Sequence, residues 1–130
     1  MTEKIVIIGG GQAAVSCASQ LRSKGFDGKI SIICEENSYP YQRPPLSKKF
    51  LTGDIPAERL QLKKMDYYKT NNIQVLLASR ATKIDRDNKK IYLQSGEKID
   101  YTKLVIATGS RARKAPLSDR DRYSNVFYLR

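Results

Sequence analysis

Short runs of consecutive apolar residues alternate with helix-like and turn-like segments along the chain. The runs at 5–8, 29–34 and 103–107 are mostly apolar and rich in isoleucine and valine, which is typical of strands buried on both faces of a parallel sheet. Between the first two runs, residues 12–24 carry small apolar side chains at helical spacing, and Gly25 is a natural helix stop. This order of strand, helix and strand predicts a βαβ unit. The expected buried face of the helix comprises Ala13, Ala14, Cys17, Ala18 and Leu21.

The middle of the chain changes character. The prolines in residues 36–60 predict a stiff extended loop that closes as a short helix over 45–51 and ends at Gly53. A helix over 65–70 and a strand over 73–77 follow. Three short segments between 81 and 100 then alternate apolar and polar positions, with turn residues between them, and this pattern predicts a small antiparallel meander.

Glycines follow the first strand at once and give the spacing G-x-G-x-x-G/A at Gly9, Gly11 and Ala14. In dinucleotide-binding folds the first position allows the tight turn, the second leaves room for a pyrophosphate, and the third lets the helix pack closely on the strand. Glu35 ends the second apolar run, about twenty residues further on, where a carboxylate accepts hydrogen bonds from ribose hydroxyls. The alternative is an α/β turn that binds no phosphate and leaves this glutamate solvated. It does not explain why strand, glycine turn, helix, strand and acid follow in the order that dinucleotide binding needs.

Composition limits the remaining function classes. The 130 residues suffice for one domain, and the formal net charge of +11 suits an acidic protein partner, nucleic acid or an anionic surface equally well. The basic residues are dispersed, no nucleic-acid motif accompanies them, and no apolar run is long enough for a membrane span or a secretory signal. With no histidine and only two cysteines, Cys17 and Cys34, we expect no metal site, no redox cysteine pair and a cytoplasmic location.

Three separated segments together are similar to one family. Residues 5–14, 40–48 (Pro-Tyr-Gln-Arg-Pro-Pro-Leu-Ser-Lys) and 106–110 (Ile-Ala-Thr-Gly-Ser) resemble the pyridine nucleotide–disulfide oxidoreductase superfamily. The middle motif is similar to the branch of ferredoxin, rubredoxin and putidaredoxin reductases and apoptosis-inducing factor. The resemblance implies an α/β, Rossmann-like FAD-binding domain with a parallel sheet, helices and a small meander, and it makes FAD the expected cofactor.

The same resemblance assigns residues to the cofactor. It places the pyrophosphate on the glycine turn and the first helix, the ribose on the acids after the second strand, and Pro44 against the isoalloxazine. Composition alone favours Arg43 and Lys48 as solvated loop cations, and the resemblance reverses that interpretation: Arg43 would contact phosphate and Lys48 would be the catalytic residue beside the flavin. The full cofactor-binding set is Gly9, Gly11, Gln12, Ala13, Ala14, Glu35, Glu36, Arg43, Pro44, Lys48, Ala81, Ala107, Thr108, Gly109 and Arg113.

Members of the family are considerably longer than this chain, so we expect a fragment of a parent enzyme. Residues 1–115 would form the N-terminal part of the FAD domain without its final strand, and 116–130 would lead toward an absent NAD(P)-binding domain. The parent would pass electrons from NAD(P)H through FAD to a ferredoxin- or rubredoxin-like acceptor, whereas the isolated chain would be inactive and could form a homodimer through its open sheet edge. The alternatives are a non-catalytic FAD- or ADP-binding module and a related oxidase or disulfide reductase.

Overall fold

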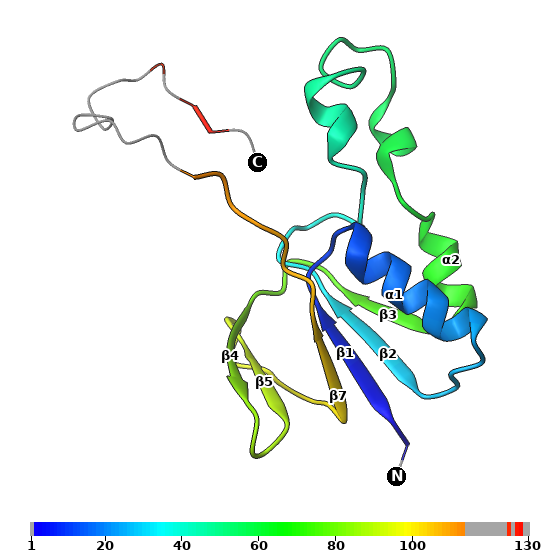
Figure 1. The fold of residues 1–130 in the computed structure, drawn as a ribbon, viewed down its shortest axis with the longest axis vertical. Coiled ribbons are helices and arrows are strands. Elements are labelled where there is room, and N and C mark those ends of the chain that lie inside the picture. Colours follow the sequence, from blue (N-terminus) through cyan, green and yellow to red (C-terminus); the bar gives the residue numbers. More distant parts are fainter. Residues whose placement is uncertain (1, 114–124, 126, 129–130) are drawn as a thin grey trace.

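A four-stranded parallel sheet lies at the centre of the computed structural model, which describes residues 2–113, 125, 127 and 128. Its strands are β1 (Lys4–Ile8), β2 (Lys29–Ile33), β3 (Ile73–Leu76) and β7 (Lys103–Ile106), in the order β3-β2-β1-β7 (Figure 1). The predicted strands are confirmed to within one residue at each end, because continuous apolar runs bounded by polar residues leave little freedom in their placement.

Two helices cover one face of this sheet. Helix α1 (Gln12–Ser23) crosses from β1 to β2, and α2 (Met65–Thr70) precedes β3 (Figure 1). Since successive side chains of a strand point to opposite faces, Ile5 and Ile7 of β1 face the helices, where they join one core cluster with the fully buried Tyr68 of α2.

The opposite face of the sheet packs against an antiparallel meander. It consists of β4 (Ala81–Asp85), β5 (Lys90–Leu93) and β6 (Lys98–Asp100), all as predicted. Val6 contributes to a second core cluster with Ile91 of the meander, which is fully buried. The three layers are therefore helices, parallel sheet and meander, and the middle strands β1 and β2 are largely buried on both faces. The sequence predicts burial of the run at 103–107 as well, but β7 is an edge strand and its Ile106 is exposed.

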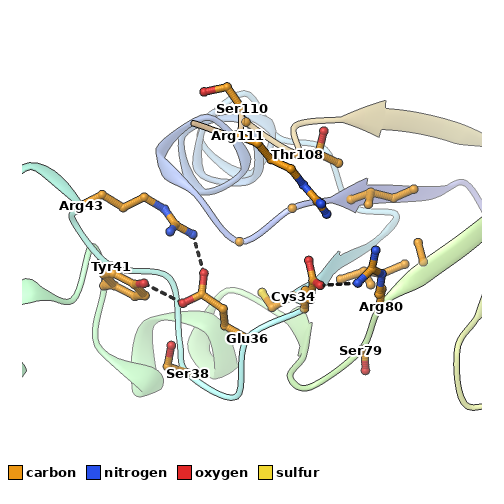
Figure 2. Close-up of a pocket in the computed structure, with 17 residues that line it drawn as sticks. Cys34, Glu36, Ser38, Tyr41, Arg43, Ser79, Arg80, Thr108, Ser110 and Arg111 are labelled. Carbon is orange, nitrogen blue, oxygen red and sulfur yellow. Dashed lines mark hydrogen bonds and ion pairs between the residues drawn. The ribbon is translucent and has the colours of Figure 1, made fainter. Parts of the chain in front are cut away.

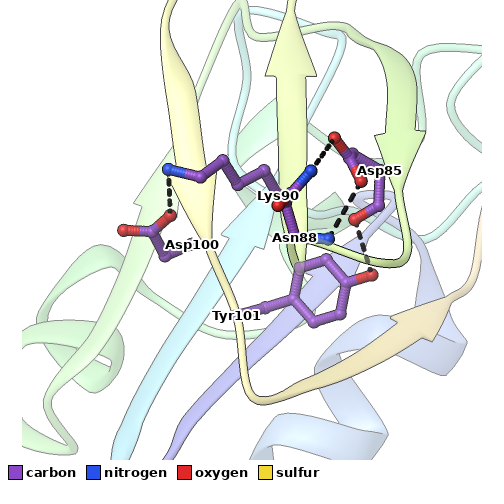
Figure 3. A network of polar contacts seen from close by, with 5 residues as sticks. All are labelled: Asp85, Asn88, Lys90, Asp100 and Tyr101. Atoms are coloured by element: carbon purple, nitrogen blue, oxygen red, sulfur yellow. Dashed lines mark hydrogen bonds and ion pairs between the residues drawn. The ribbon is translucent and has the colours of Figure 1, made fainter.

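Polar contacts hold the meander's first turn (Figure 3). The Asp85 carboxylate accepts hydrogen bonds from the Asn88 backbone N–H and side-chain amide at 3.0 and 2.9 Å, and these bonds lower the pKa of that carboxyl. Lys90 forms an ion pair with Asp100 at 3.3 Å, and the Tyr101 hydroxyl donates to the Asp85 carbonyl at 3.5 Å. The ion pair joins β5 to β6, and the Tyr101 hydrogen bond joins the residue after β6 to the end of β4.

Two expectations for helices need correction. Instead of a helix over 45–51, a short 3₁₀ helix spans Pro44–Ser47 and irregular turns follow, because Lys48 (φ −132°, ψ −117°) leaves the helical region. A second 3₁₀ helix, Ala57–Leu60, lies later in the same loop. In α1, Ala13 is exposed and Val15 is buried, so the buried face is rotated from the one predicted.

The segment 116–130, expected to be a linker toward an NAD(P)-binding domain, falls almost entirely outside the described residues. Within the described part of the chain, no helix has both the length and the apolar character needed to span a bilayer.

Two isoleucines of different exposure test the packing of the meander. Ile91 is 0% exposed and Ile106 is 64% exposed. We expect Ile91→Ala to lower the free energy of unfolding by about 2–5 kcal/mol, since it leaves a cavity between meander and sheet. Ile106→Ala, the matched control, should change it by less than about 0.5 kcal/mol. Denaturant unfolding measures both, and equal losses would contradict the three-layer arrangement.

Candidate functional site

A cavity of about 320 Å³ opens at the carboxyl edge of the parallel sheet (Figure 2). Its lining includes Gly9, which follows β1, Glu35, which follows β2, and Thr108, which follows β7. Segments far apart in sequence meet here because parallel strands bring all their carboxyl ends to one edge, which is where ligands of open α/β sheets bind.

The three consecutive glycines have different structural reasons. Gly9 has φ of +120°, and a Cβ there would lie 2.1 Å from the Ala107 carbonyl oxygen. A Cβ on Gly10 would lie 2.8 Å from the Cys34 sulfur. At Gly11, a Cβ would meet no described atom within 4 Å, so this glycine faces open space. The first two glycines therefore serve close packing, and Gly11 keeps the approach to the helix open.

The N-terminus of α1 carries no compensating side chain of its own. Gly11 is its N-cap residue, in an extended conformation, and it lacks a side chain that could cap the helix. The first turn contains no acidic residue. The free N–H groups and the positive end of the helix dipole therefore favour an anion at this end.

A second cavity of about 560 Å³ adjoins the first and is more apolar. Its own lining includes Pro44 and Leu46 from the loop after β2, and Ala107 and Ala112 from the segment after β7. Several residues line both cavities, and they include the charged Arg43 and Arg111: the shared set is Gly10, Arg43, Thr108, Gly109, Ser110 and Arg111. Together the cavities offer a polar compartment and an apolar compartment with cationic side chains at their junction.

The two acids after β2 each bind an arginine. An Arg80 Nη1 atom lies 3.0 Å from Glu35 Oε1, with both side chains about half exposed. Glu36 accepts hydrogen bonds from Arg43 Nη2 and, at 2.6 Å, from the Tyr41 hydroxyl (Figure 2). The bond to Glu36 raises the pKa of Arg43, and burial followed by the same carboxylate raises that of Tyr41. Exposed pairs of this kind add little stability, so their arrangement matters more for a ligand.

Cys34 lines the first cavity from beneath, and its side chain is buried. Burial, with a smaller contribution from Glu36, raises the pKa of this thiol to about 11. Since the thiolate is the nucleophile, Cys34 is inert near neutral pH. This agrees with the expectation that it is a small buried residue, and both cysteines are free thiols.

The structure brings together most of the residues expected at the site. Those lining the first cavity are Gly9, Glu35, Glu36, Arg43, Ala81, Thr108 and Gly109, while Gly11, Pro44 and Ala107 line the second. The other expected residues, Gln12, Ala13, Ala14, Lys48 and Arg113, line neither cavity.

The positions of two residues in this last group have clear causes. Ala14 is 0% exposed because it packs into the core beneath the helix, as its expected role in close packing requires. The Lys48 ammonium donates instead to the Pro44 carbonyl oxygen at 3.3 Å, and that proline lines the apolar cavity. The catalytic role of Lys48 stays a prediction.

Sequence reasoning missed several lining residues, among them Arg80, Tyr41 and Arg111. Tyr41 lies inside the motif at 40–48 and could have been chosen for that reason. Arg80 comes directly before Ala81, but nothing in the sequence pairs it with a carboxylate 45 residues earlier.

Known proteins that are similar to this chain belong to one family of reductases. The model of the family described as pyridine nucleotide-disulphide oxidoreductase matches residues 3–130. Putidaredoxin reductase CamA of Pseudomonas putida is 38% identical over 130 residues, covering 98% of this chain and 31% of the relative. Rubredoxin-NAD(+) reductase of the same species is 40% identical over 126 residues, covering 97% and 32%.

Solved structures show the same relationship. The crystal structure of the covalent putidaredoxin reductase–putidaredoxin complex matches with a TM-score of 0.85 and 39% identity, covering 90% of this chain and 28% of that one. The chain thus spans about a third of the length of the curated relatives it matches.

The raised pKa of Cys34 predicts an alkaline loss of stability. The ordinary pKa of a cysteine thiol is 9.0, so above pH 9.0 the unfolded chain has lost this proton while the folded protein still keeps it. The stabilisation is complete below pH 9 and disappears as the pH rises to about 11. In denaturant unfolding from pH 8 to 11, Cys34→Ala should show a shallower fall than the wild type. Parallel falls in the two proteins would contradict this assignment.

Proposed function

This chain belongs to the pyridine nucleotide-disulphide oxidoreductase family, and we propose that it carries FAD-binding residues of an NAD(P)H-dependent, ferredoxin-type reductase. The observation that carries the proposal is the pair of adjoining cavities at the carboxyl edge of the sheet, both of which are lined in part by the glycine turn. Relatives named as putidaredoxin and rubredoxin reductases support the class of reaction.

The residues around the cavities fit a flavin dinucleotide. An opening at Gly11 lies in front of an uncapped helix N-terminus, as a diphosphate requires. The polar cavity offers the Glu35 carboxylate for ribose hydroxyls, and the adjoining cavity offers apolar atoms of Pro44 and Leu46 for a flat ring system. NAD and FAD have the adenosine diphosphate half in common, so the polar cavity does not distinguish them. The apolar cavity, which offers a surface for a flat ring system, is the part that favours FAD.

In this proposal each side chain has a binding or electrostatic role. Arg43 donates charge-assisted hydrogen bonds to phosphate, for which its planar fork is well suited. Lys48 adds a positive charge near the flavin and favours negative charge there during hydride transfer. Bound FAD supplies the chemistry that the side chains lack, which is acceptance of a hydride and release of single electrons.

The cysteine pattern favours an external electron acceptor over a protein disulfide. Cys17 is partly buried in α1, Cys34 is buried after β2, and the two thiols are free. No pair of neighbouring cysteines within these 130 residues could cycle between dithiol and disulfide. We therefore propose a small ferredoxin- or rubredoxin-like iron–sulfur protein as acceptor, for which the net charge of +11 would favour an acidic surface.

Retention of FAD tests this function directly. The purified chain, mixed with FAD and desalted, should keep a flavin absorption spectrum. Gly11→Ala should weaken FAD binding by about tenfold or more, equivalent to about 1.4 kcal/mol, because the new methyl group fills space in front of the helix. Its φ of −104° and open surroundings suit alanine, so its melting temperature should match the wild type. A folded wild-type chain that binds no FAD would overturn the proposal.

Removal of an acid tests the ribose contact. Glu35→Ala should weaken FAD binding by about 1.5–3 kcal/mol, because charge-assisted hydrogen bonds to hydroxyls are lost. Glu3→Ala is the matched control: Glu3 forms an equally exposed ion pair with Lys103 at 2.8 Å, outside both cavities. Titration calorimetry with FAD should show normal affinity for that control. Normal affinity in both variants would reject the role of Glu35.

A further inference from the structure

We propose that Glu36 and Tyr41 are positioning residues that hold the Arg43 guanidinium at the junction of the two cavities, ready to bind a diphosphate. The inference rests on the proposed dinucleotide site, adds Tyr41 to it, and gives Glu36, already expected at the cofactor, the role of orienting Arg43. Neither of them need touch the phosphates.

Arg43 is held from two sides. Its Nη2 atom donates to Glu36 Oε1, and its guanidinium carbon lies 5.2 Å from the centre of the Tyr41 ring. The Tyr41 hydroxyl donates to the other oxygen of the same carboxylate at 2.6 Å. The three side chains form a network in which Tyr41 supplies both a stacking surface and a hydrogen bond (Figure 2). A long side chain that would otherwise sample many rotamers is thereby restricted before any ligand arrives.

The network leaves donors available. Among the described residues, only Nη2 of Arg43 donates to a protein acceptor, so Nε and Nη1 remain for an anion. Arg43 lines both cavities, while Glu36 and Tyr41 line the polar one. Arg43 thus provides free guanidinium donors in a residue that lines both compartments, and a dinucleotide spanning both would have its diphosphate between them.

The opposite effect is also chemically reasonable: Glu36 could neutralise Arg43 and compete with phosphate. Two observations favour positioning. The carboxylate accepts a hydrogen bond from the Tyr41 hydroxyl at 2.6 Å, so its charge is not directed at Arg43 alone. The carboxylate also engages one of the two terminal nitrogens and not the whole fork. The two possibilities predict opposite signs for Glu36→Gln, which makes them separable.

The first measurement needs no ligand. NMR relaxation of the Arg43 guanidinium ¹⁵N nuclei in the wild-type chain should report a restricted side chain. Tyr41→Phe keeps the ring and the net charge but removes the hydroxyl, and it should increase the mobility of Arg43. Glu36→Gln should do the same. Tyr67→Phe is the control, because the Tyr67 hydroxyl donates to Ser19 at 3.0 Å and Tyr67 lines neither of the two cavities.

The second measurement is the dissociation constant for FAD by titration calorimetry. Tyr41→Phe and Glu36→Gln should each weaken binding about three- to tenfold, as expected for loss of one hydrogen bond that orients a binding group. In an Arg43→Met background, Tyr41→Phe should have no further effect. Tyr67→Phe and Glu3→Gln should bind FAD like the wild type.

Each remaining outcome overturns a defined part of the inference. Unchanged Arg43 mobility in both variants rejects the positioning role, whatever FAD does. Tighter FAD binding by Glu36→Gln shows that Glu36 masks Arg43 and does not position it. An ordered Arg43 in a wild-type chain that binds no FAD rejects the dinucleotide site, and with it any role toward a diphosphate, while leaving the network intact.

Discussion

The close approach of two backbones at the carboxyl edge of the sheet governs the site. Gly9 lies against Ala107, so near that a Cβ would stand 2.1 Å from the carbonyl oxygen. Backbone hydrogen bonds on either side continue the sheet past the strand ends, from Gly9 N–H to the Ile33 carbonyl at 2.9 Å and from Ala107 N–H to the Ile8 carbonyl at 2.8 Å. Three chain segments therefore leave the sheet in fixed positions, and most of the lining of the cavities continues from them. Ser79, Arg80 and Ala81, which follow β3, complete the polar cavity.

That constraint depends on a sheet buried from both sides. Ile7 faces the helices and Val6 faces the meander, at 0% and 1% exposure, so neither layer can be removed without exposing strand residues. The apolar runs predict the strand boundaries and the burial of β1 and β2, but they do not show that β7 lies at an edge with Ile106 exposed. They do not contain the strand order or the packing of the meander beneath β1, since these depend on contacts between distant residues such as Val6 and Ile91.

The candidate site likewise contains features that the sequence predicts and features that depend on contacts between distant residues. Gly9 and Gly11 are recognisable from their spacing because a turn at one and an open approach at the other are local requirements, although the contact of Gly9 with Ala107 is not. Gly10 has a non-local reason, contact with Cys34, which no spacing rule expresses. The pairing of Glu35 with Arg80 is likewise absent from the sequence, because exposed side chains find partners only after the loops are placed.

Two consecutive carboxylates show how little sequence is needed to organise both sides of the polar cavity. Glu35 reaches Arg80, which precedes the meander, and Glu36 reaches Arg43 in the loop after β2. Each pair is about half exposed, so neither adds much to folding stability. Their physical effect is on the placement of charge: the pairs fix two guanidinium groups on opposite walls at little energetic cost to the fold. An anionic ligand can then bind to donors on guanidinium groups that are ordered yet not deeply buried, which keeps the ordering cost of binding low.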